Sequence, residues 1–172
     1  MGSLDELEYT VKPANGLQRI MQKVASSRPG AWLFQRTMYA LDKPLFRLSR
    51  GRLTLPGLLA GLPVIMLTTT GAKSGQSRTM PLLGIPLGGD IAVIGSNYGQ
   101  TATPGWVYNL EADSSAVVGY RDRSLAVTAR PADDEECDSA FTEAAKVYPG
   151  YGAYRARAEH RTIRVFVLEA AA

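Results

Sequence analysis

The chain has 172 residues, of which 45% are hydrophobic and 20% charged, and a formal net charge of +3 at pH 7. This is the composition of one ordinary globular domain with a sizeable core. One cysteine and one histidine exclude an intramolecular disulfide and leave no cysteine–histidine cluster for zinc, so no metal site is expected.

The N-terminus carries no targeting signal that we can identify. It opens with acidic residues and lacks the apolar run of a signal peptide, and no stretch approaches the roughly 20 apolar residues of a spanning helix. Cys137 lies among acidic residues that should raise a thiol pKa, so we interpret it as an inert helix residue. The sequence predicts a cytoplasmic protein.

The N-terminal region is basic: residues 12–57 contain nine lysines and arginines and one acid, Asp42. Asn15 is a candidate N-cap for a helix that ends before Pro29, with apolar residues at positions 17, 20, 21 and 24 on one face. Further amphipathic helices are predicted over 31–41 and 45–50, and residues 53–61 form a connector. We therefore divide the chain into an N-terminal arm, 1–57, and a second domain, 58–172.

Two interpretations of this basic arm stay open. It can lie on an anionic membrane, which would make the protein peripheral to the inner face of the cell membrane. Alternatively, its apolar faces can pack on the protein's own sheet.

From Pro63 the pattern changes to strands, predicted over 64–70, 79–87 and 91–96. Pro81 and Pro86 in the second run indicate an edge strand or a bulge. Thr103 is expected to cap a short helix that has Pro104 at its first position. Further predicted elements are strands 116–121 and 124–130, joined by the turn 122–123, a helix over 133–147, a second helix over 151–159, and a strand over 162–168.

Six strands joined mostly by short turns predict an α+β fold, with an antiparallel sheet curled into a small barrel and helices packed around it. No strand carries the Gly-rich fingerprint of a dinucleotide-binding domain.

The stretch from Met66 to Arg78 has the character of an anion cradle. Gly71 and Gly75 allow positive φ and close approach of a ligand to the backbone. Basic and hydroxyl groups suited to phosphate or carboxylate follow: Lys73, Ser74, Gln76 and Arg78. An ordinary polar hairpin turn is the alternative reading.

Three further segments could join this cradle in a site built from backbone, hydroxyls and aromatics. They are the loop 95–99, the helix start 104–110, and the tyrosines at 148, 151 and 154, which are spaced three apart. Core packing is the alternative for the tyrosines. Such a site suits an organic cofactor.

Four motifs in order carry a resemblance to a known family: LTTTGAKSGQSR at 67–78, GSN at 95–97, PGWVYNL at 104–110 and YPGYGAY at 148–154. Together they resemble the deazaflavin-dependent nitroreductase family of actinobacteria. The resemblance implies a split β-barrel of the FMN-binding type that binds coenzyme F420, with FMN as the alternative cofactor. The implied cofactor-binding residues are Thr68, Thr69, Thr70, Gly71, Lys73, Ser74, Gln76, Arg78, Pro81, Ser96, Asn97, Tyr98, Gly99, Trp106, Val107 and Asn109.

The tyrosines match the family's substrate wall, so Leu83, Tyr148, Tyr151 and Tyr154 are implied to contact the acceptor. Ser96 is a candidate to stabilise developing negative charge, and Tyr148 or Tyr151 to deliver a proton. Some family members have tyrosine where this chain has Leu83 and lysine where it has Asn97, so the substrate range is not carried over.

The resulting hypothesis is a reductase that passes a hydride from reduced F420 to a planar acceptor such as a quinone, an α,β-unsaturated carbonyl or a nitroaromatic. An FMN-dependent split-barrel enzyme and a non-catalytic cofactor-binding or membrane-surface module are the alternatives. We expect a small-molecule substrate, no nucleic-acid partner, and a monomer or homodimer.

Overall fold

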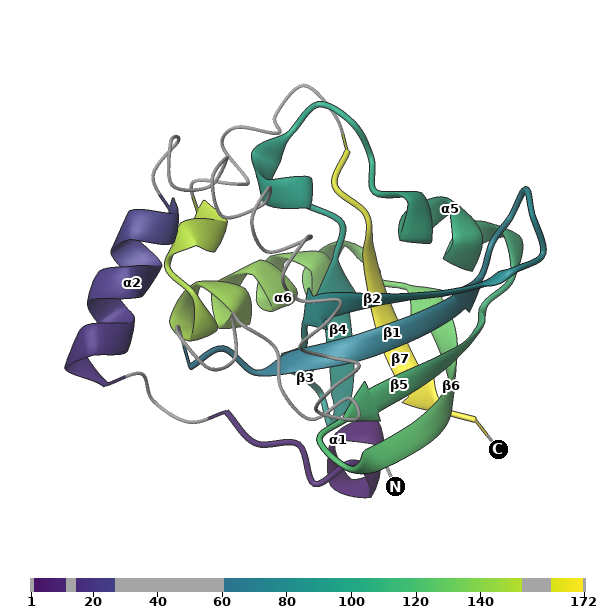
Figure 1. Cartoon of the computed structure of the whole chain (residues 1–172), viewed down its shortest axis with the longest axis horizontal. Coiled ribbons are helices and arrows are strands. Elements are labelled where there is room, and N and C mark those ends of the chain that lie inside the picture. The colour runs from purple at the N-terminus through teal and green to yellow at the C-terminus, as the bar shows by residue number, and fades with distance from the viewer. Residues whose placement is uncertain (1, 12–14, 27–60, 153–161, 172) are drawn as a thin grey trace.

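One antiparallel sheet organises the computed structural model, which describes residues 2–11, 15–26, 61–152 and 162–171 (Figure 1). Within these residues the sheet has seven strands in the order β2-β1-β5-β6-β7-β4-β3. The strands are β1 Val64–Thr70, β2 Ser77–Leu83, β3 Ile85–Leu87, β4 Asp90–Ile94, β5 Ser115–Tyr120, β6 Arg123–Pro131 and β7 Val165–Ala170. The helices are α1 Ser3–Glu6, α2 Gly16–Ser26, α5 Gly105–Ala112 and α6 Asp134–Val147, with a 3-10 turn over Asn97–Gly99.

The two edge strands of the sheet follow one another in the chain. β2 ends at Leu83 and β3 begins at Ile85, so only Gly84 joins one edge to the other. A sheet whose edges are covalently neighbours must curl, and the result is a half-barrel. The edge assignment drawn from Pro81 and Pro86 is confirmed, because these prolines lie in β2 and β3.

The expected antiparallel α+β fold is confirmed, but the count of six strands is wrong. The run predicted over 79–87 is divided at Gly84, whose amide donates to the Pro63 carbonyl (3.2 Å). Its carbonyl accepts from the Tyr9 hydroxyl (2.7 Å). The paired residues of β2 end at Leu83 and those of β3 begin at Ile85, so one predicted strand becomes two.

Two local predictions are wrong by one residue. The β5–β6 turn is Arg121–Asp122, because Tyr120 pairs with Arg123 and Arg121 adopts a φ of 55°. The N-cap of α5 is Pro104, not Thr103, because extended backbone persists through Pro104 and the helix starts at Gly105.

A third boundary differs by more: the last strand begins at Val165, three residues later than expected.

The inner face of the half-barrel holds the larger hydrophobic core. Alternate residues of β1, Ile65 and Leu67, point into it and are fully buried. Leu7 and Tyr9 enter from the N-terminal segment, and α5 contributes Trp106, Val107 and Leu110. The helices α1 and α5 lie at opposite ends of the sheet (Figure 1), so each end of the core is covered.

A second core lies between α6 and the outer face of β3, β4 and β7. Ala140 and Ala144 of α6 are fully buried against this face. The remaining buried members are Ile85, Ala92, Ile94, Tyr148, Tyr151 and Val165. The small alanine side chains let the helix approach the sheet closely, which carries the tyrosines after α6 onto the same face.

The prediction that Asn15 caps a helix is confirmed by two reciprocal hydrogen bonds. The Gln18 amide donates to Asn15 Oδ1 (2.9 Å), and the Asn15 amide donates to Gln18 Oε1 (2.9 Å). Leu17 and Ile20 on the resulting α2 are 71% and 60% exposed. The helices predicted over 31–41 and 45–50, and most of the connector 53–61, lie outside the described residues, as does most of the helix predicted over 151–159.

Candidate functional site

The predicted anion cradle forms the tip of the β1–β2 hairpin. The Gly71 amide donates to the Gln76 carbonyl (2.9 Å), and the Gly75 amide donates to the Gly71 carbonyl (2.7 Å). Gly75 has a φ of 63°, in the left-handed region that favours glycine. Lys73, Ser74, Gln76 and Arg78 are all exposed around this tip. The loop is thus a hairpin turn that presents two cations to solvent, and its role toward an anion stays a prediction.

Asn109 of α5 fixes the base of this hairpin. Its Oδ1 accepts from the Ala72 amide (3.0 Å), and its Nδ2 donates to Thr69 Oγ1 (3.0 Å). Thr69 is only 4% exposed, so this hydroxyl needs such a partner. The α5 helix therefore holds the predicted cradle in place from the end of the barrel.

The outer edge of the sheet carries the other strand residues of the candidate site. The β1–β2 register places Val64 opposite Leu83, Met66 opposite Pro81, and Thr68 opposite Thr79. Alternate residues share a face, so Leu83, Pro81 and Ser77 lie in one row along β2. Ser77 is the end of this row that lies beside the cradle. At about 3.3 Å per residue, this row spans roughly 20 Å. The sheet edge thus connects Leu83, which the resemblance assigns to the acceptor, with the cationic tip.

The loop after β4 is held tightly at its base. The Gly95 amide donates to the Arg164 carbonyl (2.9 Å), and a side chain at Gly95 would come within 2.9 Å of Val107 Cγ2. Ser96 is 5% exposed. Asn97 has a φ of 46°, and its Nδ2 donates to the Ala102 carbonyl (2.9 Å). The side chain of Tyr98 lies outside the described part.

Trp106 and Val107, which the resemblance assigns to the cofactor, lie in the first core. Val107 is fully buried, and Trp106 is 3% exposed with its ring edge-on to Phe166 at a centroid distance of 6.1 Å. Their packing fixes α5 on the barrel. A direct contact with a cofactor stays a prediction.

Three of the residues that the resemblance assigns to the acceptor come together at the other end of the edge row. Tyr148 and Tyr151 are 5% and 7% exposed, with their rings edge-to-face at a centroid distance of 6.2 Å. Leu83 packs against the cluster that contains them. Tyr154 lies outside the described residues. The structure therefore brings Leu83 together with Tyr148 and Tyr151, which lie more than 60 positions later in the chain.

A hollow of about 420 Å³ on the outer face of the sheet adjoins the predicted cofactor residues of β1. Its walls come from β1, β2, β5 and β6, with the chain after β7 at one side. The lining residues are Thr68, Thr69, Thr70, Ser77, Ser115, Ala116, Val117, Ala126, Val127, Thr128 and Ala171. Three of the sixteen predicted cofactor-binding residues, the three threonines, thus line this hollow.

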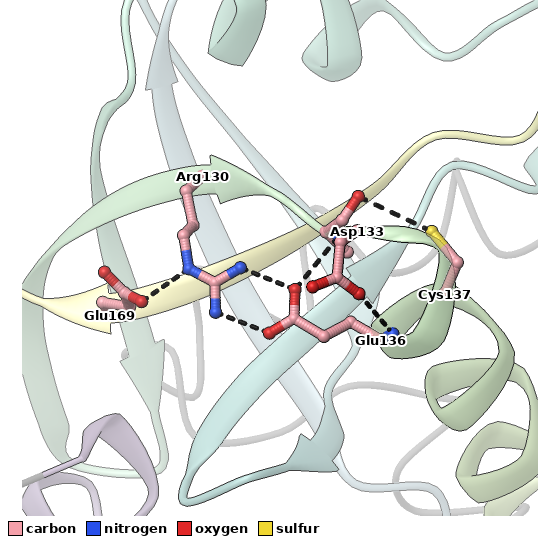
Figure 2. A network of polar contacts seen from close by, with 6 residues as sticks. Arg130, Asp133, Glu136, Cys137 and Glu169 are labelled. Carbon is pink, nitrogen blue, oxygen red and sulfur yellow. Dashed lines mark hydrogen bonds and ion pairs between the residues drawn. The ribbon is translucent and has the colours of Figure 1, made fainter.

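A second polar cluster, which the sequence analysis missed, joins β6, β7 and α6 (Figure 2). Arg130 donates from Nη1 and Nη2 to the two oxygens of Glu136, and from Nε to Glu169 Oε1. Each of these three donor–acceptor distances is 2.6 Å. The Arg130 guanidinium lowers the pKa of Glu136 to about 2. Arg130, Glu136 and Glu169 come from three different elements, so no periodic pattern in the sequence could have revealed this cluster.

A hollow of about 230 Å³ adjoins Arg130 and is lined also by Asp90, Asp133, Glu135 and Glu136. Among the described residues, no group of histidine, cysteine or carboxylate side chains could hold a metal ion. None of the helices that the structure describes is long and apolar enough to cross a membrane.

Comparison with known proteins gives a consistent result. Residues 44–170 match the F420H(2)-dependent quinone reductase family. An F420H(2)-dependent quinone reductase of Mycobacterium tuberculosis is 31% identical over 102 residues, which cover 58% of this chain and 66% of that protein. The chain thus spans slightly less than two thirds of the length of this curated relative.

Two solved structures extend the likeness to three dimensions. An F420-H2 dependent reductase (FDR-A) is 35% identical, with a TM-score of 0.57, and the match covers 62% of this chain and 94% of that one. Another structure, described as a domain-swapped dimer, is 31% identical with a TM-score of 0.59, over 82% of this chain and 99% of that one. The split-barrel architecture is therefore shared with F420-dependent reductases.

Proposed function

Because the chain belongs to the F420H(2)-dependent quinone reductase family, we propose that it is an oxidoreductase that reduces a planar, conjugated acceptor with reduced F420. A quinone is the first candidate acceptor, and an α,β-unsaturated carbonyl or a nitroaromatic belongs to the same chemical class. The observation that carries the proposal is the family match over residues 44–170, which includes all four motifs quoted above.

The anionic end of F420 would lie at the β1–β2 hairpin tip. Lys73 and Arg78 are exposed there, and no ion pair found among the described residues uses either of them. Unpaired cations attract phosphate and carboxylate groups, arginine as a two-pronged donor and lysine as a point charge. The turn also offers the exposed Ser74 side chain, whose oxygen accepts from the Gln76 amide (3.3 Å) while its hydroxyl proton can be donated to an anion.

The ring and the acceptor would lie toward Leu83, Tyr148 and Tyr151, where the site is apolar and aromatic. Bound reduced F420 would supply the hydride. The protein would hold the donor and acceptor carbons about 3–3.5 Å apart and exclude water. Ser96 would stabilise negative charge on the acceptor oxygen, and Tyr148 or Tyr151 would deliver the proton that completes a two-electron reduction.

The basic region supports a proposal about location. Residues 12–57 carry nine cations against one acid, and Leu17 and Ile20 of α2 are largely exposed. Basic, amphipathic segments bind anionic lipid surfaces, where a lipid-soluble quinone would be found. We expect binding of the protein to vesicles that contain anionic lipid, and sedimentation would decide between monomer and homodimer.

Fluorescence titration with F420, with FMN in parallel, tests the cofactor assignment. Replacing Lys73 or Arg78 by alanine should weaken F420 binding about tenfold each at low salt, because a charge-assisted contact contributes about 1.4 kcal/mol or more. The loss should shrink as salt is added. Lys146→Ala is the matched control, because Lys146 is an exposed lysine on α6 that pairs with Glu143.

Three results would contradict the proposal. Unchanged F420 affinity in both hairpin variants would remove the cradle from the site. Binding of FMN without F420 would identify an FMN-dependent split-barrel enzyme, whereas binding of neither would favour the non-catalytic alternative.

A further inference from the structure

The Tyr9 side chain reaches Gly84, the residue at which the chain passes from edge strand β2 to edge strand β3. The side chain of Tyr9 is buried, and its hydroxyl lies 2.8 Å from the Pro63 carbonyl and 2.7 Å from the Gly84 carbonyl. One hydroxyl has one proton to donate, so the two carbonyls share it. Tyr9 thus ties the entry to β1 to the junction between β2 and β3.

Gly84 itself lies outside the paired strands, although its neighbours Leu83 and Ile85 are paired with Val64 and Ala92. Gly84 makes one further backbone hydrogen bond, from its amide to the Pro63 carbonyl (3.2 Å), and it lies between the paired residues of β2 and β3. A Cβ atom at position 84 would come within 2.6 Å of Tyr9 Oη. A side chain at position 84 would therefore force the Tyr9 hydroxyl to move.

The two neighbours of Gly84 belong to the acceptor end of the candidate site. Leu83 precedes Gly84 and packs against the second core, which contains Tyr148 and Tyr151. Ile85 follows Gly84 and is fully buried in that core. Burial raises the pKa of Tyr9, and the nearby phenols of Tyr120 and Tyr151 raise it further. Tyr9 therefore stays a neutral donor throughout the physiological pH range.

We infer that Tyr9 is a positioning residue for the acceptor: by fixing the Gly84 carbonyl it sets the placement of Leu83 and Ile85 against Tyr148 and Tyr151. The inference rests on the proposed function for the nature of the acceptor. Tyr9 lies outside residues 44–170, the part of the chain that matches the family. The N-terminal segment would thus add to the site a contact that the family's shared region does not supply.

The test compares Tyr9→Phe with Tyr120→Phe. Tyr120 is the matched control, because its ring packs on Tyr9 at a centroid distance of 4.7 Å, while its hydroxyl donates to the Thr10 carbonyl instead of the junction. With menadione as acceptor, Tyr9→Phe should raise KM for menadione about five- to tenfold, the equivalent of one lost hydrogen bond. The dissociation constant of F420 should stay within about twofold, and Tyr120→Phe should change neither quantity.

Hydrogen exchange provides a readout that does not depend on activity. Peptides covering residues 83–87 should exchange faster in Tyr9→Phe than in wild-type protein or Tyr120→Phe. If the wild-type protein shows no turnover with F420H2, the proposed function fails while the exchange experiment still tests the placement of the junction. Equal exchange and equal KM in the two variants, or a parallel loss of F420 affinity in Tyr9→Phe, would overturn the inference.

Gly84→Ala supplies an independent variant that retains Tyr9. The added Cβ should displace the hydroxyl and raise KM for menadione by a similar factor. In the double variant with Tyr9→Phe, the two effects should be less than additive, because both act through the same contact. Full additivity would count against a shared contact.

Discussion

Arg130 lies between two carboxylates, and this arrangement sets the electrostatics of Glu136. The arginine uses three nitrogens for Glu136 and Glu169, and the Asp133 amide also donates to Glu136 Oε2 (3.1 Å). These donors favour the charged carboxylate, so the pKa of Glu136 falls to about 2 from 4.5. Glu136 therefore stays ionised in the folded protein well below the pH at which an unfolded chain would take up its proton.

This shift predicts a pH dependence of stability. A lowered folded-state pKa stabilises the protein above pH 4.5, and this contribution is lost as pH falls from 4.5 to 2. At pH 7, Glu136→Gln should cost about 1 kcal/mol, the upper end for partly exposed ion pairs. Thermal unfolding as a function of pH should show the two proteins converging toward pH 2. Glu135→Gln is the control, and a constant difference between wild type and Glu136→Gln from pH 7 to pH 2 would contradict the assignment.

Most side-chain hydrogen bonds between distant segments could not be predicted from the sequence. The sequence indicated that residues 66–78 leave a strand and turn, and the family resemblance grouped Leu83 with Tyr148 and Tyr151. Neither revealed that Asn109 holds Ala72 and Thr69, because hydrogen bonds between distant segments leave no local pattern. Tyr9 gave no signal for the same reason, since its partners lie 54 and 75 positions away.

Among the elements, α6 has the most complete helix start in the described structure. The Asp133 side chain accepts from the Glu136 amide (2.8 Å), and Glu136 accepts from the Asp133 amide, which together form a capping box. Three acids in the first turn add favourable interactions with the helix dipole. This start fixes the helix that leads into Tyr148.

We expect Asp133→Ala to destabilise the protein by about 1 kcal/mol, because the Glu136 amide loses its partner. For a chain of this length that corresponds to a fall in Tm of about 2–4 °C in a thermal melt. Asp134→Ala removes an acid from the same turn without removing the cap, and should cost less. An equal loss in both variants would show that charge, and not capping, stabilises this helix start.

Elements were predictable where local chemistry determined them. The β1 bounds matched the prediction, since a β-branched run there ends at a glycine turn, and the Asn15 and Asp133 caps were both foreseen as helix starts. The break at Gly84 was not predicted, because the partners of Gly84 are the Pro63 carbonyl and the Tyr9 hydroxyl, 21 and 75 positions earlier in the chain. Tertiary contacts thus override local pattern at this junction.

At the scale of the whole molecule, residues 2–11 belong to the barrel. Ser3 is fully buried, with its Oγ accepting from the Ile91 amide (2.9 Å), and Leu7 is 1% exposed in the first core. The Arg123 side chain donates to the Glu6 carbonyl and pairs with Glu8. The segment therefore closes one end of the half-barrel as α5 closes the other.

A comparison of two leucines tests this role. Leu7→Ala should lower the free energy of unfolding by about 2–5 kcal/mol, the usual cost of emptying a buried leucine site. Leu17→Ala should change it by less than about 0.5 kcal/mol, because Leu17 is 71% exposed on α2. Urea unfolding of both variants gives the measurement. A small effect of Leu7→Ala would mean that the N-terminal segment is not part of the folded core.

The position of β7 imposes an order on how the protein is made. This strand follows every other described strand in the chain, yet it lies in the middle of the sheet and pairs with β6 on one side and β4 on the other. At about 5–20 residues per second, the β1–β2 and β5–β6 hairpins exist for seconds before β7 can join them to β4. Throughout that interval the facing edges of β4 and β6 are unpaired, open to other strands in a crowded cell. Pairing of β7 with both neighbours thus removes two unpaired strand edges, and with them a route to aggregation.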